Sequence, residues 1–95
     1  MTQPRIRRDC LKWTHLEDLR LGANLTREAL AEEMGVTYDH MARVEQGRNR
    51  PGDKLLIALA TRFRAQEPTL TARTLRDTNP LYRASMARRE AEAAA

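Results

Sequence analysis

The stretch that decides the fold is "GVTYDHMARVEQGRNRP", residues 35–51. It opens with glycine, valine and threonine, and it closes with a second glycine, three polar residues and a proline. Threonine is favoured just before the first turn of a helix, and glycine is favoured where a helix stops. The pattern therefore predicts a helix over residues 38–46, with Met41 and Val44 on its apolar side.

The segment before this stretch predicts another helix that packs across it. Thr26 is the expected N-cap, and Leu30 and Met34 form an apolar stripe at helical spacing. Gly35 can take the left-handed conformation that ends such a helix. Ala31 is small enough to let a second helix cross closely. Two helices joined by a short turn with a glycine form a helix-turn-helix arrangement.

The turn residues meet the remaining needs of this arrangement. Val36 is apolar and can fill the gap between the two helices, and Thr37 can cap the second one. In a helix-turn-helix, the second helix enters the major groove of DNA while the first crosses the backbone. The spacing therefore indicates a nucleic-acid partner.

Further helices are predicted on both sides. Thr14 and Glu17 fit a capping box that begins a helix, and Gly22 and Asn24 are expected to close it. After the central stretch, leucine and alanine recur at helical spacing over residues 53–63.

The C-terminal third predicts helix as well. Residues 71–77 fit a short helix, and Asn79 and Pro80 fit the N-cap and first position of a new one. Residues 81–95 favour helix by composition, with a narrow apolar face of small side chains.

Composition agrees with a small all-helical domain. The chain has 95 residues, enough for one domain with one modest core. Helix-forming residues are abundant, and aromatic residues are only 4%, so the core is expected to be aliphatic. No stretch alternates apolar and polar residues long enough to predict a strand.

The chain is basic, and its charge is unevenly distributed. The net charge is +4 and the isoelectric point is near 10.0. Positive charge gathers in residues 1–12 and 36–64, whereas residues 13–35 are acidic. A basic balance of this kind suits a nucleic-acid partner.

Several classes of protein are excluded. The single cysteine, Cys10, cannot form an internal disulfide, and no apolar run reaches the roughly 18 residues of a membrane span. No apolar segment follows the basic N-terminus, so no signal peptide is predicted and the expected location is cytoplasmic. His15 and His40 lie far apart and no nucleophile has a base beside it, so we expect neither a metal site nor an enzyme.

Four stretches between residues 16 and 63 keep a consistent spacing: "LEDLR", "LTREALAEEMGVT", "ARVEQGRNRP" and "LLIALATRF". In these stretches, which span about half of the chain, the protein resembles the phage-repressor and Cro-like (XRE) helix-turn-helix family. The resemblance implies an all-α fold, a compact four- or five-helix bundle of the lambda-repressor-like type. It also implies sequence-specific DNA binding and, usually, a dimer.

The resemblance implies roles for individual residues. Arg20 and Glu45 match positions that form a buried salt bridge between the first and third helices. The positions that match phosphate contacts are Arg27, Thr37, Arg48, Asn49 and Arg50. The positions that match exposed, base-facing residues are Tyr38, Asp39, His40 and Arg43.

Asp39 departs from the family pattern, because it places a negative charge where a polar or basic residue is usual, and this charge repels a nearby phosphate. It can accept a hydrogen bond from a cytosine amino group, pair with Arg43 four residues on, or serve a partner other than DNA. Asp53 and the region beyond Phe63 also depart from the pattern, so the resemblance assigns no role to the C-terminal third.

Three regions are predicted: a basic N-terminal arm (1–12), a helix-turn-helix domain (13–64) and a C-terminal helical extension (65–95) that is a candidate for dimerisation. The predicted function is a transcriptional repressor that binds a palindromic double-stranded DNA operator as a homodimer, with helix 38–46 in the major groove. The alternative is a protein-interaction module of the same fold, an antitoxin-like or anti-repressor-like partner with weak or no specific DNA binding. No cofactor, membrane or small-molecule ligand is expected.

Overall fold

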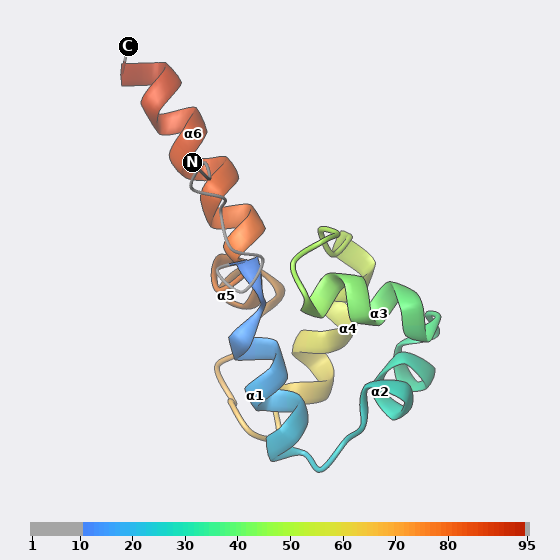
Figure 1. Ribbon diagram of the computed structural model, residues 1–95. Coiled ribbons are helices and arrows are strands. Elements are labelled where there is room, and N and C mark those ends of the chain that lie inside the picture. The colour runs from blue at the N-terminus through green and yellow to red at the C-terminus, as the bar shows by residue number, and fades with distance from the viewer. Residues whose placement is uncertain (1–10, 95) are drawn as a thin grey trace.

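The computed structural model describes residues 11–94, and within that range the protein is all-helical with no strand. The predicted basic arm lies outside the described residues except for Leu11 and Lys12. The six helices are α1 (Thr14–Gly22), α2 (Arg27–Met34), α3 (Tyr38–Glu45), α4 (Asp53–Phe63), α5 (Ala72–Asp77) and α6 (Pro80–Ala94). The first five form a compact body, and α6 projects away from it (Figure 1).

The predicted boundaries around α2 and α3 are confirmed. The hydroxyl of Thr26 accepts a hydrogen bond from the Ala29 amide at 3.0 Å, which caps α2. Thr37 caps α3 in the same way, accepting from the His40 amide at 3.1 Å. Gly35 ends α2 with a φ of 70°, the left-handed conformation that glycine adopts at little cost.

The predicted capping box of α1 is wrong. Trp13, not Thr14, is the N-cap residue, and no side chain caps this helix. The amide of Trp13 donates to the Glu45 carbonyl at 2.8 Å, so the chain is tied to α3 one residue before Thr14 and the threonine becomes helical. Glu17 pairs instead with Lys12, at 2.6 Å.

The end of α1 differs from the prediction in one respect. The helix runs through Gly22 and ends at the C-cap Ala23, so Gly22 does not close it. Asn24 takes the left-handed turn that follows, with a φ of 57°. Asparagine tolerates this region better than most residues, since its short side chain fits there.

The core is aliphatic, as predicted, with two aromatic exceptions. Its buried residues are Trp13, Leu16, Leu19, Leu30, Ala31, Met41, Val44, Leu55, Leu56, Leu59, Ala60, Phe63, Leu70 and Leu75. Trp13 was not predicted as a core residue, but it is fully buried and donates its indole N–H to the Thr78 hydroxyl at 2.9 Å. This bond joins the segment before α1 to the segment after α5.

The C-terminal helices follow the predicted pattern. Thr71 caps α5 through a capping box, and the side-chain oxygen of Asn79 accepts from the amides of Leu81 and Tyr82, which caps α6. Because Leu70 and Leu75 belong to the common core, the folded body continues past residue 64. The predicted division there remains a prediction.

Candidate nucleic-acid interface

The turn between α2 and α3 is built from backbone hydrogen bonds and one apolar plug. The amide of Gly35 donates to the Glu32 carbonyl, and that of Val36 donates to the Ala31 carbonyl at 3.0 Å. The Val36 side chain packs against the core, and Ala31 is buried where α2 and α3 meet. The two helices therefore hold a fixed angle (Figure 1).

Buried side chains hold α3 against the body. Met41 and Val44 are completely buried, and so is the carboxylate of Glu45. Arg20 of α1 reaches this carboxylate with two nitrogens, at 3.1 Å and 3.0 Å, and donates a third hydrogen bond to the Leu25 carbonyl. A bidentate guanidinium–carboxylate pair fixes orientation as well as distance, so it sets the register of α3.

Arg27 shares the same carboxylate. Its terminal nitrogen lies 3.3 Å from the Glu45 oxygen, and its Nε is buried without a hydrogen-bond partner among the described residues. Burial disfavours the charge of Arg27, but the hydrogen bond and the negative charge of Glu45 outweigh burial and raise the pKa above its ordinary value. The guanidinium therefore stays positive at the N-terminal end of α2.

The opposite side of α3 faces away from the core. Tyr38 is 46% exposed, Asp39 and Arg43 are exposed, and His40 is half-buried. Asp39 and Arg43 form no ion pair with each other, although Glu45 of the same helix pairs with Arg20 of α1 and Arg27 of α2. The predicted pairing of these two residues is therefore absent from the described structure, and the two other readings of Asp39 stay open.

The loop after α3 is tied to the helix that precedes it. Gly47 has a φ of 81°, and a Cβ added there would collide with the Leu11 carbonyl. The amides of Arg48 and Asn49 both donate to the Arg43 carbonyl, at 2.8 Å and 3.2 Å. Arg48 and Arg50 remain exposed. The loop therefore presents two cations at a fixed position beside α3.

Residues of the C-terminal extension that were not predicted as site residues lie next to the loop after α3. Arg76, Asn79 and Tyr82 line a cavity together with Arg50, although they lie more than twenty-five residues further on. The only local signals were the cap sequence at Asn79 and the arginines of α5, Arg73 and Arg76. Neither indicates proximity to the loop after α3, because that proximity arises from the packing of α5 on α4.

The described residues contain no group of three or more histidine, cysteine, aspartate or glutamate side chains placed to hold a metal ion. Among residues 11–94, no helix is both long and apolar enough to cross a membrane.

Two helices at a fixed angle, with the second exposing polar side chains beside a basic loop, define a helix-turn-helix protein. A family model described as a helix-turn-helix domain matches residues 14–74, and the chain belongs to that family. This confirms the predicted recognition at the family level and is consistent with the XRE-like resemblance. No curated protein and no solved structure matches the chain.

Proposed function

We propose that the protein is a transcriptional regulator, a repressor, that binds a specific DNA operator by inserting α3 into the major groove. One observation carries this proposal. The inner side of α3 is buried through Met41, Val44 and Glu45, and its outer side remains accessible to a partner. A helix of this kind is the element that helix-turn-helix proteins place in the groove.

The outer residues divide by chemistry. Exposed donors and acceptors on α3 suit base edges, and we assign base reading to Tyr38, Asp39, His40 and Arg43. Groups at the ends of α2 and α3 and in the next loop suit phosphates, and we assign phosphate contacts to Arg27, Thr37, Arg48, Asn49 and Arg50. Arg27 can serve both Glu45 and a phosphate, because a guanidinium carries five N–H donors.

We further propose that the protein binds a palindromic operator as a homodimer, with the C-terminal extension carrying the dimer contact. A two-fold dimer places two copies of α3 on one side of the duplex, about 34 Å or a multiple of it apart. The projecting α6 supports this assignment, because it extends away from the body and its residues from Met86 to Ala93 are all exposed (Figure 1).

Selection of bound fragments from random double-stranded DNA tests the proposal. The expected result is a palindromic consensus whose half-sites are separated by about one helical turn or a multiple. A consensus without symmetry would contradict the homodimer and retain sequence-specific binding. Recovery of random sequence alone would contradict specific recognition.

Asp39 favours a second function, a protein-interaction module of the same fold. It is an exposed carboxylate in the first turn of α3, without a cation partner among the described residues, and it repels phosphate. A gel shift with pooled genomic fragments at two salt concentrations separates the two functions. A specific band that persists at moderate salt supports the regulator, and its absence supports the interaction module.

A further inference from the structure

A small cavity lies at the point where the loop after α3, the start of α4 and the α5–α6 junction meet. Its volume is about 180 Å³, and its lining includes Arg50, Asp53, Arg76, Asn79 and Tyr82. Since a water molecule takes up about 30 Å³ of liquid volume, the cavity is large enough for a phosphate group. Four of its side chains carry hydrogen-bond donors: Arg50, Arg76, Asn79 and Tyr82.

Asn79 supplies a donor that no described residue accepts from. The residue is 1% exposed, and its Oδ1 is engaged by the amides of Leu81 and Tyr82 at 3.0 Å and 3.2 Å. This cap fixes which end of the amide is oxygen, so the other end is Nδ2. That nitrogen is buried and has no hydrogen-bond partner among residues 11–94. A buried donor without an acceptor is costly and calls for a ligand.

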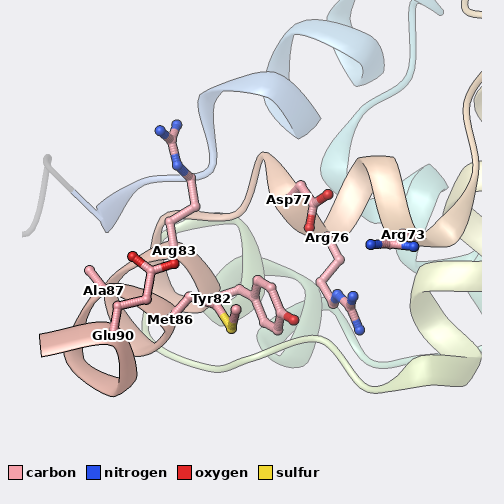
Figure 2. A pocket seen from close by; sticks show the side chains of 8 residues that line it. All are labelled: Arg73, Arg76, Asp77, Tyr82, Arg83, Met86, Ala87 and Glu90. Atoms are coloured by element: carbon pink, nitrogen blue, oxygen red, sulfur yellow. The ribbon is translucent and has the colours of Figure 1, made fainter. Parts of the chain in front are cut away.

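Arg76 supplies a second donor and a positive charge. Its guanidinium lies 4.4 Å from the centroid of the Tyr82 ring, which holds the side chain over α6. Its Nε is buried and has no hydrogen-bond partner within the part of the chain that the structure describes. Figure 2 draws a neighbouring pocket that Arg76 and Tyr82 also line, and it shows these two side chains facing each other, with Asp77 directed elsewhere. Arg76 makes no ion pair with any of the described residues. Its charge is therefore available to an anion.

The start of α4 adds the field of a helix N-terminus. The N-cap is Gly52, which has no side chain to accept from the first amides of the eleven-residue helix. Such amides and the helix dipole together favour a bound anion. Asp53 also lines the cavity and opposes an anion, but the two guanidinium groups of Arg50 and Arg76 outnumber its single charge.

We infer that this cavity binds a phosphate of the DNA backbone, with Arg76 and Asn79 completing a contact that Arg50 begins. The inference rests on the proposed function, because the loop of Arg50 directly follows α3. It assigns the α5–α6 junction a role in DNA binding that the helix-turn-helix alone does not contain. A duplex lying along α3 and this loop presents phosphodiesters at the mouth of the cavity.

Substitution of Asn79 tests the contact without removing the helix cap. Asn79→Ser and Asn79→Asp both keep an oxygen that can cap α6, but neither keeps Nδ2. Affinity for a fluorescent duplex of random sequence, measured by anisotropy at low salt, is expected to fall several-fold for Asn79→Ser. It is expected to fall about tenfold or more for Asn79→Asp, whose carboxylate occupies the site and repels phosphate. Asn24→Asp in the α1–α2 loop is the matched control, because it is isosteric and adds the same single negative charge as Asn79→Asp. It is expected to lower the affinity for the duplex less than Asn79→Asp does.

Gly52→Asp provides a variant whose fold is not at risk. A Cβ at Gly52 meets nothing within 4 Å and its φ is −76°, so an aspartate fits and caps α4 itself. The melting temperature is expected to rise while affinity for the duplex falls. Duplex affinity equal to that of the unsubstituted protein in all three variants, Asn79→Ser, Asn79→Asp and Gly52→Asp, would overturn the inference.

Titration with inorganic phosphate distinguishes the source of the ligand. The side-chain amide signal of Asn79 in nitrogen–proton spectra is expected to shift on adding duplex. A shift with inorganic phosphate, combined with unchanged duplex affinity in the variants, would make the cavity a free-phosphate site and overturn the DNA assignment. If the unsubstituted protein binds no duplex at low salt, the proposed function itself fails. In that case, the phosphate titration alone decides whether the cavity holds an anion.

Discussion

Glu45 is a completely buried carboxylate, so its two arginine partners decide what it contributes. A buried ion pair adds little net stability compared with apolar side chains, because both charges lose their water. Removing one partner is different, since it leaves a charge in the interior. Arg20 and Arg27 therefore act mainly to fix the position of α3.

Arg20→Ala is expected to lower the free energy of unfolding by about 3 kcal/mol, because it leaves Glu45 with only the single hydrogen bond from Arg27. Urea unfolding measures the change. The double variant Arg20→Met/Glu45→Met is the matched control, and we expect it to lose less than the single variant. A larger loss in the double variant would show that the pair contributes stability of its own.

Arg43 is the residue on α3 best suited to recognise guanine, because a guanidinium can bind two acceptors on one base edge. Arg43→Ala is expected to weaken binding to the selected operator by about 1–3 kcal/mol and binding to random DNA much less. Anisotropy titrations on the two duplexes measure this difference. Equal losses on both would make Arg43 a phosphate contact, and no loss on either would remove α3 from the interface.

At the scale of elements, the helix-turn-helix depends on a single left-handed residue. Gly35→Ala places a Cβ in the left-handed region, which costs about 1–2 kcal/mol even though nothing lies within 4 Å of the added atom. Because the strain falls between α2 and α3, duplex affinity is expected to fall as well. Thermal unfolding and anisotropy measure the two effects.

Gly22→Ala is the matched control for this change. Gly22 is the last residue of α1, its φ is not positive, and a Cβ there also meets open space. Alanine is the better helix former, so this variant is expected to be stabilised by about 0.5 kcal/mol with unchanged duplex affinity. Similar destabilisation by both variants would mean that the conformation of Gly35 is not the cause.

The elements that were predictable from the sequence are those set by local chemistry. Thr26, Gly35 and Thr37 act through backbone groups within three residues, so their types alone indicate caps and a turn. The start of α1 was misjudged because a distant contact decides it: the Trp13 amide bonds to the Glu45 carbonyl. Thr14 fits the local pattern but is overruled by that contact.

The candidate site divides in the same way. The exposed residues of α3 and the basic loop follow from helical spacing. Arg27 was expected to face phosphate alone, and its contact with Glu45 depends on how α1, α2 and α3 pack. The cavity at Asn79 was not predicted, because it is lined by residues from the start of α4 and from the end of α5. Only the folded core brings these two helix ends together.

At the scale of the whole molecule, the indole of Trp13 links two distant parts of the chain. Its N–H donates to Thr78, sixty-five positions away, and the Thr78 hydroxyl donates in turn to the Leu75 carbonyl at 2.6 Å. Thr78→Val keeps the shape and removes the acceptor, which leaves the indole N–H buried without a partner. We expect a loss of about 1–2 kcal/mol in unfolding free energy.

The fluorescence of Trp13, the single tryptophan, follows this unfolding directly. Thr61→Val is the control, since that hydroxyl is exposed and bonds only to the Ile57 carbonyl within α4. Its unfolding free energy is expected to stay within about 0.5 kcal/mol of the unsubstituted value. An equal loss of unfolding free energy in both variants would show that the hydrogen bond from Trp13 to Thr78 stabilises the fold no more than the exposed hydrogen bond of Thr61 does.

The projecting part of α6 packs little against the body. Its removal can therefore test the oligomeric state of the protein without a large change in unfolding free energy. From Met86 to Ala93 every residue is exposed, and Met86 itself is 37% exposed. A chain ending at Arg83 keeps the Asn79 cap and the Tyr82 ring, so its unfolding free energy is expected to stay within about 0.5 kcal/mol when both chains are measured as monomers at low concentration.

If α6 carries the dimer contact, sedimentation equilibrium is expected to show a dimer for the full chain and a monomer for the shortened one. The affinity of the shortened chain for the operator then falls steeply, since the two half-sites are no longer bound by one linked pair of protomers. A shortened chain that still dimerises would place the contact on the helix-turn-helix body, and a full chain that stays monomeric would remove the palindromic operator from the proposal.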